Sequence, residues 1–280
     1  MTPEEIHAIP AVDVHSHFGP YNVKPGEEYY PAAIETPGED VLLRRLAQAG
    51  VAVSINSHMY GLMPRGKGDP FTANVMLVEA IERLPGVYGW VIVDPTKPET
   101  FAQARELLSH PKVLGIKVHP EEHLYPIREY GEKIYEFAAK EGCIIVTHSG
   151  EPNSMPEDFC FFANRYPTVK TIISHLGCGF DGCYEHQLRA IEENTQDNLF
   201  TDTSSAKSLM AGIIEYAVGR IGSEKILFGS DHTCYFLPSQ RVRIDCADIT
   251  DEDKKNILYR NALRIFPEIA AVYEKETAGR

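Results

Sequence analysis

The sequence predicts an α/β protein that folds as a single (β/α)8 barrel, the TIM-barrel architecture. Eight apolar, β-branched runs alternate with segments of helical pattern. Most of the runs are nearly continuous in Val, Ile and Leu, as in parallel strands whose outer face is covered by helices. Eight strand-then-helix units imply right-handed crossovers and close naturally into a barrel. A chain of 280 residues suits one such domain, spanning 1–280.

Each predicted strand is an apolar run bounded by Gly, Pro or polar residues. The strands cover 11–17, 51–57, 87–93, 113–119, 143–148, 169–175, 198–203 and 225–231. The predicted helices between them are amphipathic and end at helix stop signals such as Gly50 and Pro85-Gly86. They lie within 38–50, 72–86, 98–111, 128–142, 156–167, 184–194 and 204–220.

Residues 250–275 follow the eighth strand and predict two terminal helices, the first capped by Thr250 or Asp251. The alternative fold, an open doubly wound sheet, would need a Gly-rich phosphate loop after an early strand. The sequence contains no such loop, and no internal repeat or linker divides the chain. The barrel is therefore the preferred architecture.

Composition limits the kind of partner. The net charge of −13 argues against nucleic acid and against an anionic membrane, so we expect a small-molecule substrate. No long apolar run and no signal peptide are evident, which predicts a soluble cytoplasmic protein. The six cysteines lack a CxxC pair and fit free thiols in a reducing compartment. A homo-oligomer remains open, since no interface is recognisable from the sequence.

Metal-ligand residue types recur at the ends of the predicted strands. They are His15 and His17 in DVHSHFG, His148 in VTHSG, His175 in ISHLG and Asp231 in FGSDH. Residues two apart on a strand share a face, so His15 and His17 should project into the lumen together, with Asp13 one step deeper. Barrel active sites assemble from the C-terminal ends of several strands. We therefore expect all five side chains to converge.

Three imidazoles and a carboxylate suit Zn²⁺ or a similar first-row cation such as Mn²⁺, and they leave a position for water. A metal of this kind lowers the pKa of its bound water toward about 7. His175 could then remain outside the metal's ligands as a base, an acid or a hydrogen-bonding group. The alternatives for His175 are a further ligand and a core histidine that bonds to backbone.

Six segments resemble motifs of the amidohydrolase superfamily, specifically its amidohydrolase-related branch of metal-dependent hydrolases and decarboxylases. They are DVHSHFG, GIKVHP, VTHSG, ISHLG, FGSDH and ILYRNALRIF, and they span nearly the whole chain. The resemblance implies that His15, His17, His148 and Asp231 bind the metal. It also implies that His175 is the catalytic acid or base and that Asp231 takes a proton from water.

Three further residues are candidates for substrate contacts. In binuclear relatives a carboxylated lysine on strand four bridges two metals, and Lys117 occupies a comparable strand, so one or two ions are possible. Lys117 could otherwise contact the substrate or pair with a carboxylate such as Asp13. His119 shares the face of Lys117. His58 and the following loop with Arg65 could bind a substrate carboxylate or simply be solvated.

These observations predict a metal-dependent hydrolase that attacks an amide, lactone or related carbonyl with activated water. The alternative is a metal-dependent non-oxidative decarboxylase that uses the same site. The absence of an arginine directly after the early strands, where it could clamp a leaving carboxylate, favours hydrolysis. A third possibility is a barrel that has lost catalysis and only binds a ligand.

Overall fold

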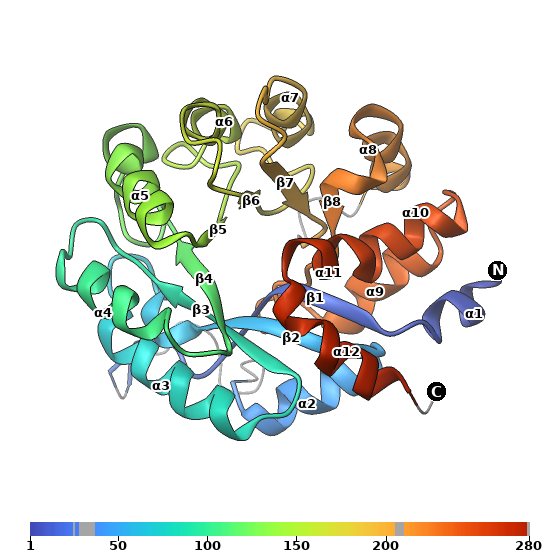
Figure 1. Cartoon of the computed structure of the whole chain (residues 1–280), viewed down its shortest axis with the longest axis horizontal. Coiled ribbons are helices and arrows are strands. Elements are labelled where there is room, and N and C mark those ends of the chain that lie inside the picture. Colours follow the sequence, from blue (N-terminus) through green and yellow to red (C-terminus); the bar gives the residue numbers. More distant parts are fainter. Residues whose placement is uncertain (25, 28–36, 205–209, 279–280) are drawn as a thin grey trace.

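The computed structural model describes residues 1–24, 26–27, 37–204 and 210–278. Eight parallel strands pair in sequence order from β1 to β8, and helices cover their outer face (Figure 1). The strands are β1 Ala11–Phe18, β2 Val51–His58, β3 Val87–Ile92, β4 Val113–Val118, β5 Ile144–Thr147, β6 Thr171–Ile173, β7 Leu199–Asp202 and β8 Ile226–Leu227. The predicted (β/α)8 barrel is confirmed.

The chain after β8 closes the barrel against β1. Val14 N donates to Phe228 O at 3.0 Å, and Ser230 N and Asp231 N both donate to His15 O, at 3.1 and 2.7 Å. A parallel bridge between Ser16 and His232 continues the closure. Because these backbone bonds join the two ends of the barrel, they hold Asp231 beside the histidines of β1.

The helices between the strands follow the predicted alternation. They are α2 Glu39–Gln48, α3 Pro70–Arg83, α4 Glu99–Leu107, α5 Ile127–Glu141, α6 Pro156–Arg165, α7 His186–Glu192 and α8 Ile213–Ile221. The helix predicted within 204–220 begins later than expected, and its residues 205–209 lie outside the described part of the chain. Short 3₁₀ helices at Met59–Gly61 (η1) and Ser223–Lys225 (η2) complete the connections.

The structure adds two helices that the sequence pattern did not predict. Helix α1, Pro3–His7, begins with a capping box in which Thr2 accepts from Glu5 N, and α9, Leu237–Asp245, follows β8. The terminal region was predicted as two helices, but the structure divides it into more and shorter helical segments. It comprises α10 Asp251–Lys255, a π-helix at Asn256–Arg260, α11 Asn261–Ile265, a 3₁₀ turn at Pro267–Ile269 and α12 Ala270–Thr277. The predicted cap is confirmed, since Thr250 accepts from Asp253 N.

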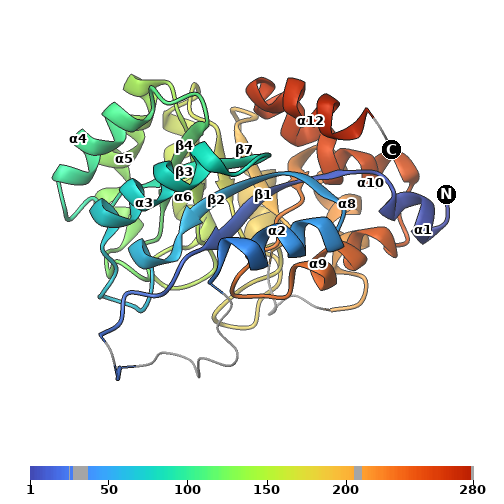
Figure 2. The ribbon, with the colours of Figure 1, turned by 90° about the horizontal axis from the view of Figure 1, so that it is seen from below.

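Two large hydrophobic cores support the strands, and a small third cluster is formed by Leu62, Ala73 and Ile92. The larger one lies between the strands and the surrounding helices, and the smaller one fills the barrel beside the terminal helices. In the smaller core Trp90 donates from Nε1 to Val14 O at 2.9 Å and packs edge-on against Phe266. Tyr273 of α12 donates to Pro10 O at 2.8 Å, just before β1. Figure 2 shows α12 on the same side of the molecule as α1 and the N-terminus. The terminal helices thus close the N-terminal end of the barrel and leave the opposite end for a site.

Candidate metal centre

A cavity of about 270 Å³ lies at the C-terminal ends of the strands. All five residues that were predicted to converge line it: His15, His17, His148, His175 and Asp231. The loop after β2 adds an apolar wall of Met59, Leu62 and Met63, and further lining residues include Arg65, His119, Glu122 and Glu151. Side chains from distant parts of the sequence therefore meet at one site, as the strand-end pattern predicted.

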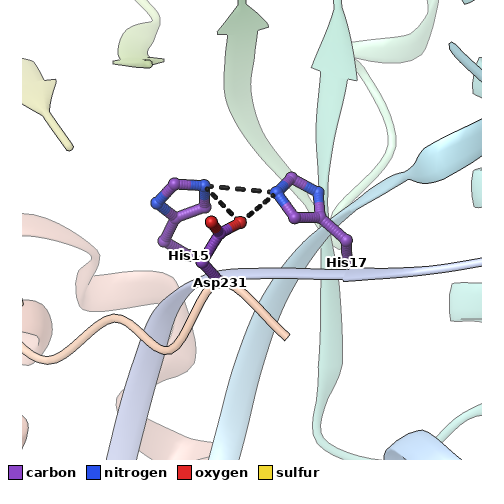
Figure 3. Close-up of side chains that lie close together, drawn as sticks. All are labelled: His15, His17 and Asp231. Carbon is purple, nitrogen blue, oxygen red and sulfur yellow. Dashed lines mark hydrogen bonds and ion pairs between the residues drawn. The ribbon is translucent and has the colours of Figure 1, made fainter. Parts of the chain in front are cut away.

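Three donor atoms converge on the floor of this cavity (Figure 3). His15 Nε2 lies 3.2 Å from His17 Nε2, and Asp231 Oδ1 lies 3.5 and 3.0 Å from those two nitrogens. Two ligand atoms on a tetrahedral zinc ion, each about 2.1 Å from the metal, would be separated by about 3.4 Å. The spacing of this group therefore fits a divalent metal ion.

The second nitrogen of each imidazole, Nδ1, is anchored in a way that turns Nε2 toward the other two donors. His15 Nδ1 lies 2.9 Å from Asp202 Oδ2, and His17 Nδ1 lies 2.8 Å from Ser57 Oγ. When Nδ1 carries the proton and donates to these oxygens, the Nε2 lone pair points at the ion. The carboxylate beside His15 is the arrangement commonly found behind metal-binding histidines.

The protonation states also suit a metal. Burial lowers the pKa of His15 and of His17, the latter to about 4, so both rings are neutral near pH 7. Burial alone would raise the pKa of Asp231, but its hydrogen bond with His17 and its favourable electrostatic interaction with His15 keep that pKa below its usual range. Neutral imidazoles and an ionised carboxylate are the forms that bind metal.

An irregularity in β1 brings the two histidines to this face. Asp13 pairs with Ser54 and Ser16 pairs with Asn56, so Val14 and His15 together oppose a single residue of β2. The bulge shifts the alternation of the strand. Asp13 therefore does not lie on the same face as His15, as strict alternation had predicted; its carboxylate accepts from the backbone His15 N at 3.1 Å and from Ser230 N and Ser230 Oγ at 3.0 and 2.5 Å.

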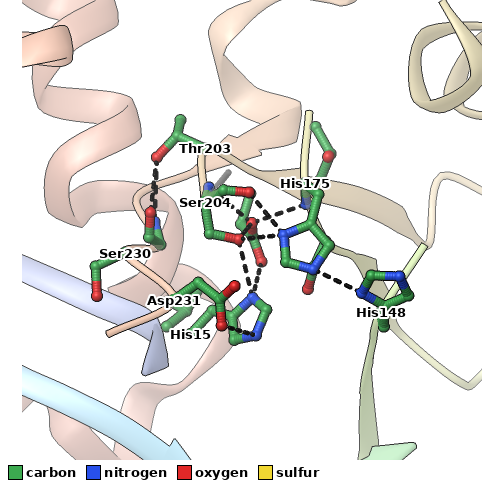
Figure 4. A network of polar contacts seen from close by, with 12 residues as sticks. His15, His148, His175, Thr203, Ser204, Ser230 and Asp231 are labelled. Atoms are coloured by element: carbon green, nitrogen blue, oxygen red, sulfur yellow. Dashed lines mark hydrogen bonds and ion pairs between the residues drawn. The ribbon is translucent and has the colours of Figure 1, made fainter. Parts of the chain in front are cut away.

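Asp202, at the end of β7, connects the floor to His175. Figure 4 shows His175 between Ser204 and His148. Its Oδ1 accepts from His175 N at 3.1 Å and from Ser204 N at 3.0 Å, while Oδ2 faces His15. Burial would raise the pKa of this carboxyl, but the charge and hydrogen bond of His15 and the charge of His175 lower it. The sequence reasoning missed Asp202, although its place at a strand end was a usable signal.

His175 and His148 face each other beside the three-donor group. His175 Nε2 lies 2.9 Å from His148 Nδ1, and His175 Nδ1 lies 2.7 Å from Ser204 O. His148 Nε2 lies 2.7 Å from Glu151 Oε2. Within residues 1–24, 26–27, 37–204 and 210–278, the sets of donors close enough to share an ion are His15–His17–Asp231 and His15–His175–Asp202. His148 lines the same cavity but belongs to neither set.

The three predicted substrate residues lie at different places. Lys117 is buried beneath the cavity with Nζ 2.8 Å from His15 Nε2, and burial lowers its pKa to about 8. His119 lines the cavity and stacks on His148 with ring centroids 4.4 Å apart. His58 is not among the lining residues; its Nδ1 accepts from Tyr60 N and its ring packs against Phe18. The structure therefore places Lys117 and His119 at the site, and it places His58 outside the cavity lining.

A cluster of charges forms one part of the cavity rim. Arg65 Nη2 lies 3.2 Å from Glu122 Oε1 and 3.7 Å from Glu151 Oε1, and Nη1 lies 3.8 Å from Glu121 Oε2. Burial raises the pKa of Glu122, and the charge of Arg65 opposes this shift. No sequence pattern indicates that these residues meet, because they belong to three different loops.

Fold and site together define a (β/α)8-barrel protein with a histidine and carboxylate centre suited to a divalent metal. A sequence model of the amidohydrolase family matches residues 12–267, and the chain belongs to that family. The resemblance drawn from the motifs is confirmed, and with it the prediction of an enzyme of the amidohydrolase superfamily. No curated protein sequence matches the chain significantly.

Solved structures of the same fold include two decarboxylases and a hydrolase. A 2,6-dihydroxybenzoate decarboxylase from Rhizobium is 13% identical over 92% of this chain and 98% of its own, with a TM-score of 0.71. A dihydroxybenzoic acid decarboxylase from a Polaromonas species, with manganese and 2-nitroresorcinol bound, is 14% identical over 92% and 97%, with a TM-score of 0.67. A proposed 2-pyrone-4,6-dicarboxylic acid hydrolase from Pseudomonas putida is 14% identical over 93% and 98%, with a TM-score of 0.65. Such low identities establish a shared fold only.

None of the helices in the described residues is long and apolar enough to span a bilayer.

Proposed function

We propose that this protein is a metal-dependent hydrolase that attacks an amide, lactone or related carbonyl of a small molecule. The observation that carries the proposal is the convergence of His15 Nε2, His17 Nε2 and Asp231 Oδ1 within 3.5 Å of one another. Zn²⁺ and Mn²⁺ both accept this donor set. We propose His148 as a fourth ligand, because it lines the same cavity, and Zn²⁺ as the resident ion.

The residues around this group suit acid–base chemistry. A divalent ion held there would polarise the substrate carbonyl and acidify a water molecule. Asp231, ionised at neutral pH, can accept the proton of that water. His175 can donate or accept a proton at Nε2, because its Nδ1 is held by Ser204 O at 2.7 Å. Lys117 is proposed to contact the substrate or a second ion from below, and His119 to contact the substrate from the wall.

Decarboxylation with the same site is the second candidate, favoured by the similar structures from Rhizobium and Polaromonas, which are decarboxylases. Hydrolysis is preferred because Arg65 already faces three carboxylates, so it is poorly placed to hold a leaving carboxylate.

An isotope experiment separates the two reactions. Protein reconstituted with Zn²⁺ or with Mn²⁺ would be incubated in H₂¹⁸O with a panel of lactones and amides and with dihydroxybenzoates. Metal-dependent incorporation of ¹⁸O into a product carboxylate supports hydrolysis. Metal-dependent release of carbon dioxide without incorporation would replace it with the second candidate. Elemental analysis of wild type and His148→Asn tests the proposed fourth ligand, because loss of His148 should then weaken metal retention.

We further propose that residues 1–280 act as one cytoplasmic domain that binds a small molecule and no nucleic acid or membrane. The net charge of −13 supports this choice of partner. Assembly into a homo-oligomer remains a prediction, and light scattering coupled to size-exclusion chromatography measures it directly.

A further inference from the structure

The rim of the cavity carries more carboxylates than cations. Among the residues that the structure describes, Arg65 is the one arginine within ion-pair range of these carboxylates. Its guanidinium nitrogens lie 3.8, 3.2 and 3.7 Å from carboxylate oxygens of Glu121, Glu122 and Glu151. Glu122 and Glu151 line the cavity themselves. A single guanidinium cannot neutralise three carboxylates, so this side of the cavity has a negative potential when the three are ionised.

Glu122 has an unused acceptor. The residue is 8% exposed, and its Oε1 accepts from Arg65 Nη2. Its other oxygen, Oε2, is buried and has no hydrogen-bond partner among the residues that the structure describes. A buried carboxylate oxygen without a donor is unfavourable, and the cost disappears when a ligand supplies one. Because Glu122 lines the cavity, a rotation of its carboxyl group would turn Oε2 toward a ligand bound there, and that ligand would supply the donor.

We propose that the substrate carries a cationic N–H donor, such as an ammonium or guanidinium group, at the end remote from the reacting carbonyl, and that Glu122 binds it. This inference rests on the proposed function, because it places the carbonyl at the histidine floor. A buried carboxylate that accepts from a cationic donor forms a charge-assisted hydrogen bond, stronger than a neutral one.

The rest of the cavity limits the size of such a substrate. Its volume is about 270 Å³, at the small end for ligand sites. Met59, Leu62 and Met63 form an apolar wall on the loop that also carries Arg65. A short carbon chain between the carbonyl and the cationic group fits these dimensions and this wall.

The alternative hypothesis is a substrate with a carboxylate group that binds to Arg65. An incoming carboxylate would approach Glu122 and Glu151 at the same time as Arg65, and like charges in a partly buried site repel strongly. Arg65 serves better as the counter-ion that keeps neighbouring carboxylates ionised and in place. We therefore assign Glu122, rather than Arg65, as the residue that selects the substrate.

Binding of three matched probes tests the assignment without any turnover. The probes are aliphatic hydroxamic acids, which chelate divalent metals, of equal chain length and ending in an ammonium, a methyl or a carboxylate group. Titration calorimetry on the zinc-loaded full chain at fixed pH gives the three dissociation constants. We expect the ammonium probe to bind about tenfold more tightly than the methyl probe, and the carboxylate probe to bind most weakly.

The variant Glu122→Gln should remove the preference for the ammonium probe and leave binding of the methyl probe unchanged. Glu106→Gln, an exposed glutamate on α4 that does not line the cavity, is the matched control and should behave as wild type. If Glu122→Gln fails to fold, the order of the three probes on wild-type protein still tests the assignment.

The outcomes distinguish the two levels of the proposal. Equal binding of the three probes, or strongest binding of the carboxylate probe, overturns the substrate class and leaves the metal site intact. Retention of the ammonium preference in Glu122→Gln overturns the role of Glu122. Failure of every probe to bind the zinc-loaded protein contradicts the proposed function, and the inference falls with it.

Discussion

The floor and the rim of the cavity are built in different ways. On the floor, the side chains of His15 and His17 are buried, and both rings are anchored through Nδ1, by Asp202 and Ser57. On the rim, Arg65 is 46% exposed in its side chain, and Glu122 keeps one oxygen without a partner. The floor residues lie at the ends of strands, whereas the rim residues lie in loops.

This difference separates two tasks of an enzyme site. Chemistry needs groups held close to the reactive geometry before the substrate arrives, and strand ends fixed by a hydrogen-bonded sheet provide this. Recognition needs groups whose interactions are completed by the ligand, and loops can vary them without disturbing the barrel. Substitutions on the floor should therefore affect metal binding and turnover, and substitutions on the rim should affect ligand preference.

The largest effect is expected from Asp231→Asn on the floor. The amide can no longer accept a proton and is a poor metal ligand, so turnover in the ¹⁸O assay should fall by about a thousandfold. Folding should be preserved, because the backbone bond from Asp231 N to His15 O does not involve the side chain. Circular dichroism and thermal melting provide the control. A variant of near-normal rate would remove Asp231 from the mechanism.

A smaller effect on the floor is expected from Asp202→Asn. The amide cannot hold the Nδ1 proton of His15 as the carboxylate does, so metal affinity should fall by about tenfold to a hundredfold. Competition with a fluorescent chelator measures the affinity independently of activity. Thr203→Ser, at the neighbouring position, is a conservative control. Unchanged affinity in Asp202→Asn would show that the contact with His15 has no bearing on the metal.

The floor was largely predictable from the sequence, because strand ends are where barrel sites form. The runs that end at His17, His148, His175 and Asp231 were recognisable from their apolar residues alone. Asp13 was misplaced because a bulge in β1 shifts the alternation, and a pattern of period two cannot reveal an extra residue. Asp202 lies in FTDTS, where no motif drew attention to it, although the strand-end argument applied equally.

The rim was beyond sequence reasoning for a physical reason. Contacts between Arg65, Glu122 and Glu151 depend on the paths of three loops, and loop conformation follows from turn geometry and packing rather than from a repeating pattern. The contacts of the His148 ring with Glu151 and His175 were equally unpredictable, because they depend on the orientation of the side chain. Likewise, His186 lies in the polar segment 184–194, and its burial to 8% exposure follows from tertiary contacts rather than from that pattern.

The third prediction sharpens the contrast by changing the rim alone. Arg65→Gln should leave metal affinity within about twofold of wild type, because Arg65 contacts rim carboxylates and none of the three floor donors. Its ion pairs are partly exposed, so the loss in the free energy of unfolding should be no more than about 1 kcal/mol. The chelator competition and a denaturant titration measure the two quantities. A large drop in metal affinity would mean that rim and floor are energetically coupled.

The smallest effect is expected at His186, the first residue of α7. This histidine bonds to the loop after β6, and the same loop brings Cys178 to the cavity wall. His186 Nδ1 lies 2.7 Å from Glu157 Oε1, and its Nε2 lies 3.1 Å from Asp181. Burial opposes a charge on His186, but hydrogen bonds to Glu157 and Asp181 outweigh it and raise the pKa. A histidine whose folded pKa is raised stabilises the protein fully below its unfolded pKa of about 6.5, and this stabilisation is lost as pH rises through the folded pKa.

The free energy of unfolding should therefore contain a contribution from His186, of less than about 1 kcal/mol, that declines as pH rises above about 6.5. Denaturant titrations of wild type and His186→Gln at several pH values between 6 and 9 isolate it as a difference between the two curves. The difference should shrink with rising pH, and metal affinity at constant pH should be the same in both proteins, because His186 contacts neither floor nor rim carboxylates. A difference that grows with pH would mean that His186 is neutral in the folded protein, and that its contacts with Glu157 and Asp181 are ordinary hydrogen bonds rather than ion pairs.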